Sequence, residues 1–279
     1  VFEYYADAFL FKSVIPPLAD VMQQDLQAYH RAGVHTMQVL LTGDAPFLTP
    51  QINLWLFGRL AWNPGIDLWG CVEDFSRAVF GVDLSGYYRS LQAAYRPLLD
   101  LVPEEIFLKI DDSLLSAISD PPADMGDPIH APDAVLRQKV RHSEKVLEDL
   151  ADAGSCLHRV EEPSMHAAWQ AEKDVFSLHH SWLCFCLYRL CMYDALRRRS
   201  NQEARRALDG AQAALEDILA WGRRHVVDAR YKENWEFMHV IFWRLRLDKT
   251  RTEIPGNQLR GTFIRIGGLL QAFRLLRAM

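Results

Sequence analysis

Apolar residues spaced three and four positions apart run through most of this chain, and this spacing predicts helices. Two prolines open one such stretch at residues 16–31, and Gly33 ends it. Thr49 and Pro50 begin another, which a Pro-Gly turn ends after residue 62. Two more helices are predicted over residues 68–80 and 84–101, so the first hundred residues are expected to be rich in helix.

Two short apolar runs break this pattern and predict strands, at residues 1–5 and 35–41. The helix at residues 16–31 lies between them, and the connection is too long for a hairpin. We therefore expect two parallel neighbouring strands with that helix as the crossover. Since two strands leave edges and faces uncovered, the chain is expected to pair with a second polypeptide or with a missing N-terminal region.

Residues 111–132 contain four prolines and several aspartates, and this composition predicts a linker or a long surface loop. Helical spacing resumes after it. A long helix is predicted from Ser164 to about Arg199. It is apolar nearly all round between Val175 and Met192, which is typical of the middle of a helix bundle. Ser200 with Glu203 matches a capping box at the start of the next helix. Two final helices are predicted over residues 235–247 and 258–279.

The composition and charge of the chain limit the kinds of partner it is expected to bind. The chain has 279 residues, of which 49% are hydrophobic and 24% charged, as in soluble globular proteins. No apolar run approaches the length of about 18 residues that a membrane span needs, so no membrane partner is expected. Residues 1–128 carry 17 acidic against 7 basic side chains. This acidic first part argues against nucleic acid and suits a neutral ligand such as a carbohydrate.

Five cysteines are an odd number, and free thiols predict a reducing, cytoplasmic location; a removed N-terminal signal is the open alternative. His180, Cys184 and Cys191 share one side of a predicted helix. Because one helix cannot surround a tetrahedral ion alone, core packing is expected there and no metal site is predicted. The sequence contains no nucleotide-binding or serine-hydrolase motif, so no cofactor is expected.

Several residues in the first part of the chain also match those of a known protein family. They are Val1-Phe-Glu-Tyr-Tyr5, Asp25, Gly33-Val34, Asn53, Arg59-Leu-Ala-Trp-Asn-Pro64, Asp67, Glu73-Asp-Phe75, Phe80-Gly81 and Tyr87-Tyr88. With them the chain resembles the C-terminal part of bacterial glycoside-hydrolase-like proteins that carry a domain of unknown function, distantly similar to α-glucuronidases. The likeness covers about the first 100 residues.

The resemblance implies a mainly α fold with a small α/β part. Residues 1–62 would be the last βα units of a TIM-like barrel, and residues 63–279 an all-helical domain. The function it implies is a contribution to barrel closure and to part of the sugar site of a glycoside hydrolase. The earlier strands are not in this sequence, so the catalytic pair stays unknown and the isolated chain is expected to be inactive. The alternative is a non-catalytic helical interaction or carbohydrate-binding module.

Substrate-binding candidates lie where the two strands end, since barrel chemistry sits at the carboxyl ends of strands. They are Glu3, Tyr4, Tyr5, Asp7 and Asp44. Carboxylates accept hydrogen bonds from sugar hydroxyls, and tyrosine rings stack on pyranose faces; ordinary loop polarity and packing is the alternative. Core packing is the expected fate of the tryptophans, including Trp55 and Trp62. For Trp221 and Trp235, stacking on sugar is the alternative.

Overall fold

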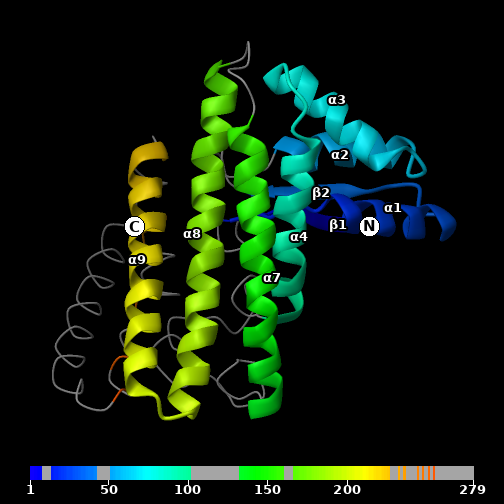
Figure 1. The fold of residues 1–279 in the computed structure, drawn as a ribbon. Coiled ribbons are helices and arrows are strands. Elements are labelled where there is room, and N and C mark those ends of the chain that lie inside the picture. Colours follow the sequence, from blue (N-terminus) through cyan, green and yellow to red (C-terminus); the bar gives the residue numbers. More distant parts are fainter. Residues whose placement is uncertain are drawn as a thin grey trace. The chain divides into compact units, whose positions relative to one another are not determined.

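The computed structural model describes residues 1–7, 14–42, 51–101, 132–159 and 166–226, together with seven single positions between 232 and 254. Its elements there are β1 (Phe2–Asp7), α1 (Ala19–Arg31), β2 (Gln38–Thr42), α2 (Gln51–Trp62), α3 (Leu68–Phe80), α4 (Ser85–Leu101), α7 (Asp133–His158), α8 (His166–Arg197) and α9 (Asn201–His225) (Figure 1).

Packing divides the chain into two compact units. The first comprises Val1–Asp100 and Glu144–His179, and the second comprises Leu101–Ser143 and His180–Met279. The expected division into domains at residue 62 stays a prediction, and that residue falls within the first unit.

The predicted order of strand, helix and parallel strand is present at the start of the first unit (Figure 1). β1 pairs with β2 in parallel, with Phe2 opposite Gln38 and Ala6 opposite Leu41. The register shifts between Glu3 and Ala6, so the ladder is irregular. Both strands are short, and α2 packs against β1.

The expectation of terminal βα units of a TIM-like barrel is wrong. In the described part of the chain, β1 and β2 pair only with each other, and all other elements are helices. A barrel needs eight strands in one closed ladder. Instead of a third strand, helix α2 packs against β1, and the described fold is mostly helical.

Two glycines set where the chain turns in this unit. α1 buries Met22 and Leu26 on its inner side and is followed by Gly33, whose φ is +73°. Gly81 closes α3 with a φ of +77° and donates its backbone N–H to the carbonyl of Arg77 at 3.0 Å. Glycine tolerates this left-handed conformation without a steric cost, so both predicted helix ends are confirmed.

The rest of the first unit packs α4 against residues 144–158 of α7 and residues 166–179 of α8. The Tyr87 ring of α4 meets the Phe176 ring of α8 edge to face, with centroids 5.9 Å apart. Gly154 of α7 lies against the same Phe176, and a Cβ at Gly154 would be 3.1 Å from that ring. A small residue on α7 therefore makes room for an aromatic one on α8.

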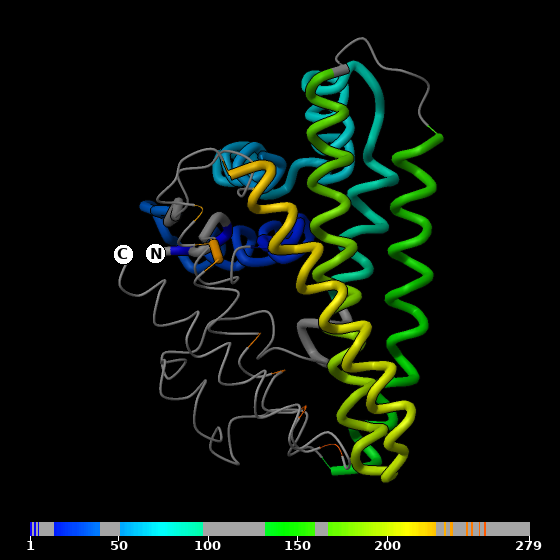
Figure 2. Tube along the Cα trace, turned by 90° about the vertical axis from the view of Figure 1, so that its left-hand side faces the viewer, coloured from blue at the N-terminus to red at the C-terminus, as the bar shows by residue number. Residues whose placement is uncertain are grey.

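In the second unit, residues 180–197 of α8 and the whole of α9 run side by side (Figure 2). The apolar stripe predicted for α9 is buried and comprises Ala204, Leu208, Ala211, Leu215 and Ile218. Ser200 lies at the N-cap of α9, but its side chain makes no capping hydrogen bond. The Glu203 carboxylate instead accepts a hydrogen bond from Arg198 at 2.6 Å, so the predicted capping box does not form.

Three predicted segments lie wholly or largely outside the described residues. The predicted linker at residues 111–132 lies outside the described residues except for its last position, and the helix predicted at 258–279 lies wholly outside them. Of the helix predicted at 235–247, only single positions are described. Among the helices in the described ranges, none has both the length and the apolar content needed to cross a bilayer.

Two glycine-to-alanine variants are expected to change stability in opposite directions. At Gly222 a Cβ would collide with the indole of Trp235, so Gly222→Ala should lower the free energy of unfolding by about 1–3 kcal/mol. At Gly58 a Cβ would meet no atom within 4 Å, and alanine favours helix, so Gly58→Ala should raise it by about 0.5–1 kcal/mol. Urea unfolding of both variants measures the difference, and a stabilised Gly222→Ala would contradict the packing described.

Candidate functional site

An aromatic surface lies on the outward side of α2. Trp55 is 38% exposed and Trp62 is 92% exposed, whereas tryptophan side chains are usually largely buried. Seven helical residues fall short of two full turns by about 20° and rise about 10 Å, so both rings occupy one face. Arg59, also exposed, lies between them on that face. We call Trp55, Arg59 and Trp62 the α2 platform.

Gly58 borders the α2 platform on the side opposite Arg59. Since a Cβ at Gly58 would meet no atom within 4 Å, the space beside the two indoles is open. A larger residue there would fill part of that space. The platform therefore offers two exposed aromatic faces, one guanidinium and an unobstructed approach.

Trp55 is held in place from two sides. Its ring lies 6.0 Å from the ring of Phe75 on α3, in a tilted arrangement. On its own helix, the guanidinium carbon of Arg59 is 5.7 Å from the Trp55 ring centroid, within the range of a cation–π contact. These contacts restrict the Trp55 side chain.

The turn that follows Trp62 is held by α1. The Gln23 side-chain amide donates to the carbonyl of Ile66 at 2.9 Å. One helical turn further, Gln27 donates to the carbonyl of Pro64 at 3.0 Å. Because both bonds reach backbone atoms, they fix the end of α2 regardless of the side chains in the turn.

On its inward side, α2 is anchored by Asn53, which is fully buried. The Asn53 side-chain nitrogen donates to the carbonyls of Tyr5 and Pro16, at 3.1 and 3.0 Å. Its side-chain oxygen accepts the backbone N–H of Leu18 at 3.1 Å. One amide therefore joins α2 to β1 and to the segment that leads into α1.

Of the predicted sugar-binding residues, Glu3 and Tyr5 both lie against α1. Tyr29 donates a hydrogen bond from its hydroxyl to the Glu3 carboxylate, and Tyr5 donates to Asp25 at 2.9 Å. The bond to Glu3 raises the pKa of Tyr29 to about 12. Burial, followed by the bond to Asp25, raises the pKa of Tyr5. Both pairs connect β1 to α1, and both tyrosines stay protonated at neutral pH.

For the other three predicted residues, the structure describes no side-chain contact with α1. Tyr4 and Asp7 belong to β1, but their side chains lie outside the description, and Asp44 lies outside the described residues altogether. A role for the five residues in sugar binding therefore stays a prediction.

A polar cluster that sequence reasoning missed lies in the first unit between α4 and α8. Tyr87 and Tyr88 interact with the carboxylate of Glu172, which is partly exposed. Burial and the Glu172 carboxylate raise the pKa of both tyrosines, and the buried Tyr87 hydroxyl makes no hydrogen bond to any described atom. Loss of water raises the pKa of Glu172, and the two hydroxyls partly offset that rise.

Two helical turns after Glu172 on α8, His179 forms a second polar contact with α4. Its Nδ1 lies 2.7 Å from the hydroxyl of Tyr95, and both side chains are buried. Burial lowers the pKa of His179 to about 4, so the imidazole is neutral at physiological pH. The seven-residue spacing shared by Tyr88 and Tyr95 on α4, and by Glu172 and His179 on α8, was the signal available in the sequence.

In the second unit, Cys184 lies 3.8 Å from Nδ1 of His180, its neighbour one helical turn earlier. Burial raises the pKa of the Cys184 thiol and of the Cys191 thiol, which makes both poor nucleophiles. Within the described ranges, no cluster of three or more histidine, cysteine, aspartate or glutamate side chains could hold a metal ion.

The tryptophans considered in the sequence analysis are only partly buried as expected. Trp221 and Trp235, considered for sugar stacking, are 2% and 3% exposed, with ring centroids 5.7 Å apart. Trp55 and Trp62, expected in the core, are exposed instead, so the expectation for these two is wrong. Their spacing permits either fate, and only packing against the opposite face of α2 decides it.

Comparison with known proteins adds nothing to this geometry: no protein-family model matches the chain, nor does any curated protein or solved structure. The resemblance to glycoside-hydrolase-like proteins therefore stays an expectation. Any function rests on the residues themselves.

Proposed function

We propose that this chain is a non-catalytic carbohydrate-binding module in which the α2 platform binds a neutral oligosaccharide. The observation that carries the proposal is the exposure of Trp55 and Trp62 on one face of α2. A monomer gains nothing from leaving two large aromatic rings in water, so their exposure favours a binding role.

The chemistry of the platform suits a sugar chain. The C–H groups on a pyranose face pack against an indole, and a separation of about 10 Å between the two tryptophan positions spans about two sugar residues. The Arg59 guanidinium offers donors to hydroxyl oxygens between them. Phe75 contacts Trp55, and Gln23 and Gln27 hold the turn that follows Trp62. Because these contacts restrict the platform, little conformational freedom is lost when a ligand binds.

Hydrolysis is not part of this proposal. A glycosidase needs two carboxylates on either side of the scissile bond, and the expectation of such a site rested on barrel units. The Glu3 carboxylate already accepts a hydrogen bond from Tyr29, and the α2 platform contains no carboxylate. We therefore expect no release of chromophore from aryl glycosides by this chain.

Affinity electrophoresis tests the proposal with soluble xylan, mixed-linkage glucan and amylopectin in the gel. The native chain is expected to be retarded by at least one of them. Trp62→Ala should weaken that binding by about tenfold, since an aromatic contact is worth about 1–1.5 kcal/mol. Tyr188→Ala removes another exposed aromatic side chain, 43% exposed on α8, and should leave the retardation unchanged.

Gly58→Gln provides a second arm that does not remove a tryptophan. The longer side chain would occupy the open space beside the indoles, and it should reduce binding while the helix keeps its stability. Absence of retardation by all three polysaccharides would overturn the proposal. So would retardation that Trp62→Ala and Gly58→Gln leave intact.

A further inference from the structure

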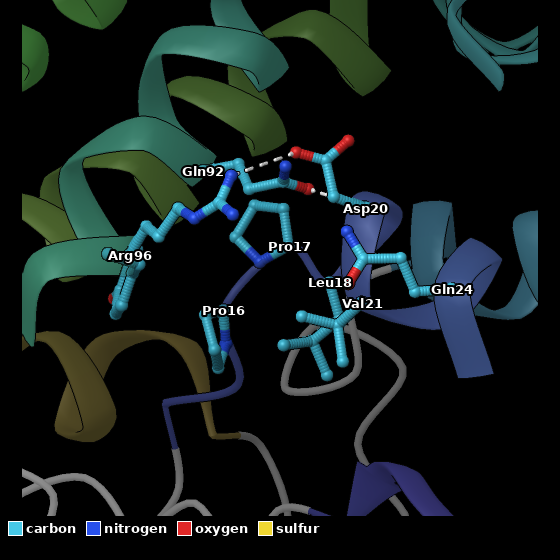
Figure 3. Close-up of a pocket in the computed structure, with 9 residues that line it drawn as sticks. Pro16, Pro17, Leu18, Asp20, Val21, Gln24, Gln92 and Arg96 are labelled. Carbon is cyan, nitrogen blue, oxygen red and sulfur yellow. Dashed lines mark hydrogen bonds and ion pairs between the residues drawn. The ribbon is translucent and has the colours of Figure 1, made fainter. Parts of the chain in front are cut away.

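A small pocket lies in the first unit between the start of α1 and the last turns of α4 (Figure 3). It encloses about 60 Å³. Its apolar walls are formed by Pro16, Pro17, Leu18, Val21 and the Tyr95 ring. Since a single water needs about 10–15 Å³ of such space, the pocket holds several waters or a few carbon atoms.

Opposite charges stand at the pocket mouth. The guanidinium of Arg96 and the carboxylate of Asp20 face each other across Pro17, with a nitrogen–oxygen distance of 3.8 Å (Figure 3). This distance is too long for a hydrogen bond. Within the described residues, neither charged group makes a side-chain hydrogen bond elsewhere. Exposure of 71% for Arg96 and 32% for Asp20 leaves both charges accessible.

Two amides complete the polar part of the pocket. The Gln92 side-chain oxygen accepts the backbone N–H of Asp20 at 3.3 Å, which ties α4 to the start of α1 (Figure 3). Its NH₂ group is then oriented away from that bond and offers a donor beside Arg96. Gln24, one helical turn after Asp20, is exposed and lines the same pocket.

We propose that this pocket binds a small apolar α-amino acid in its zwitterionic form. The carboxylate would be held by Arg96 and the NH₂ group of Gln92, and the ammonium by Asp20. The apolar side chain would rest on Pro16, Pro17 and Val21. A ligand with one charge only would be repelled by one of the two facing groups, whereas a zwitterion converts a long ion pair into two short charge-assisted bonds.

The size of the pocket limits the ligand. Its volume of about 60 Å³ suits a side chain such as that of valine better than an aromatic one, since an apolar cavity that binds benzene measures about 150 Å³. This inference is independent of the α2 platform, because it uses no residue of that surface. A failure of carbohydrate binding would leave it unchanged.

Isothermal titration with valine and two analogues tests the inference on the full chain. Isobutylamine lacks only the carboxylate of valine, and 3-methylbutanoate lacks only its ammonium. Valine should bind, and each analogue should bind at least tenfold more weakly. Arg96→Gln and Asp20→Asn should each weaken valine binding by a similar factor. Arg89→Gln, two helical turns before Arg96 on α4, should leave it unchanged.

Three outcomes would overturn the inference. The first is absence of heat with valine at its highest soluble concentration. The second is equal affinity for valine and 3-methylbutanoate, which would mean that the pocket binds a simple anion. The third is a loss of affinity in Arg89→Gln equal to that in Arg96→Gln, which would mean that only net charge matters. Thermal melts of each variant confirm that the fold is kept.

Discussion

Replacing Asn53 with leucine is expected to lower the free energy of unfolding by about 4 kcal/mol. The substitution removes three buried hydrogen bonds at once, those that join the Asn53 side chain to Tyr5, Pro16 and Leu18. Each backbone group left without a partner in the interior costs about 1–3 kcal/mol. Local rearrangement and the added apolar volume of leucine offset part of the sum.

The same substitution at Asn63 is the matched control. Asn63 is exposed, and within the described residues its side chain accepts only the backbone N–H of Gly65, at 3.1 Å, so Asn63→Leu should cost no more than about 1 kcal/mol. Urea unfolding followed by circular dichroism compares the two variants. Equal losses of stability would show that Asn53 does not join β1, α1 and α2 in the way described.

The second large effect is a loss of stability in acid caused by His179. Burial lowers the pKa of this side chain from 6.5 to about 4 in the folded chain. Between these values the unfolded chain binds a proton that the folded chain does not, so stability falls as the pH falls from 6.5 to 4. A shift of this size corresponds to about 3 kcal/mol at the acid end.

His179→Gln should abolish this dependence, because glutamine does not titrate and offers an oxygen to the Tyr95 hydroxyl. Glu172 acts in the opposite direction. Its raised pKa makes its stabilising contribution present in acid and lost as the pH rises through the folded value. The measurement is therefore the difference between wild type and His179→Gln, in which the contribution of Glu172 cancels.

Unfolding free energies of both proteins at several pH values between 4 and 7 give that difference. His142→Gln serves as the control, since His142 is exposed on α7, and its curve should follow the wild type. Identical pH dependence of wild type and His179→Gln would contradict a buried, neutral imidazole at this position.

Local structure could be predicted from the sequence because it depends on neighbouring residues. Helical spacing gave α1, α3, α4 and α9, and the glycines at positions 33 and 81 gave two helix ends. The β1–α1–β2 order followed from run lengths and from the length of the connection. Each of these features is decided within a few turns of chain, where propensity and capping act.

The architecture around these elements depended on contacts between distant residues. Two parallel strands are compatible with a barrel. The barrel is excluded from the described fold because no further described segment pairs with β1 or β2. Competition between partners also occurs at short range: Glu203 fits a capping box, but its carboxylate accepts a hydrogen bond from Arg198, five residues earlier. Sequence pattern does not rank such competing partners, because their distances are set by packing.

The candidate sites divide in the same way. The sequence determined that Trp55 and Trp62 share one face of a helix, and that Glu172 and His179 share one face of another. Only the tertiary structure decided that the first pair meets water and the second meets tyrosines of α4. Spacing sets which side chains lie on the same face. Which face becomes buried is decided by the elements that pack against it, because burial is a property of the assembled core.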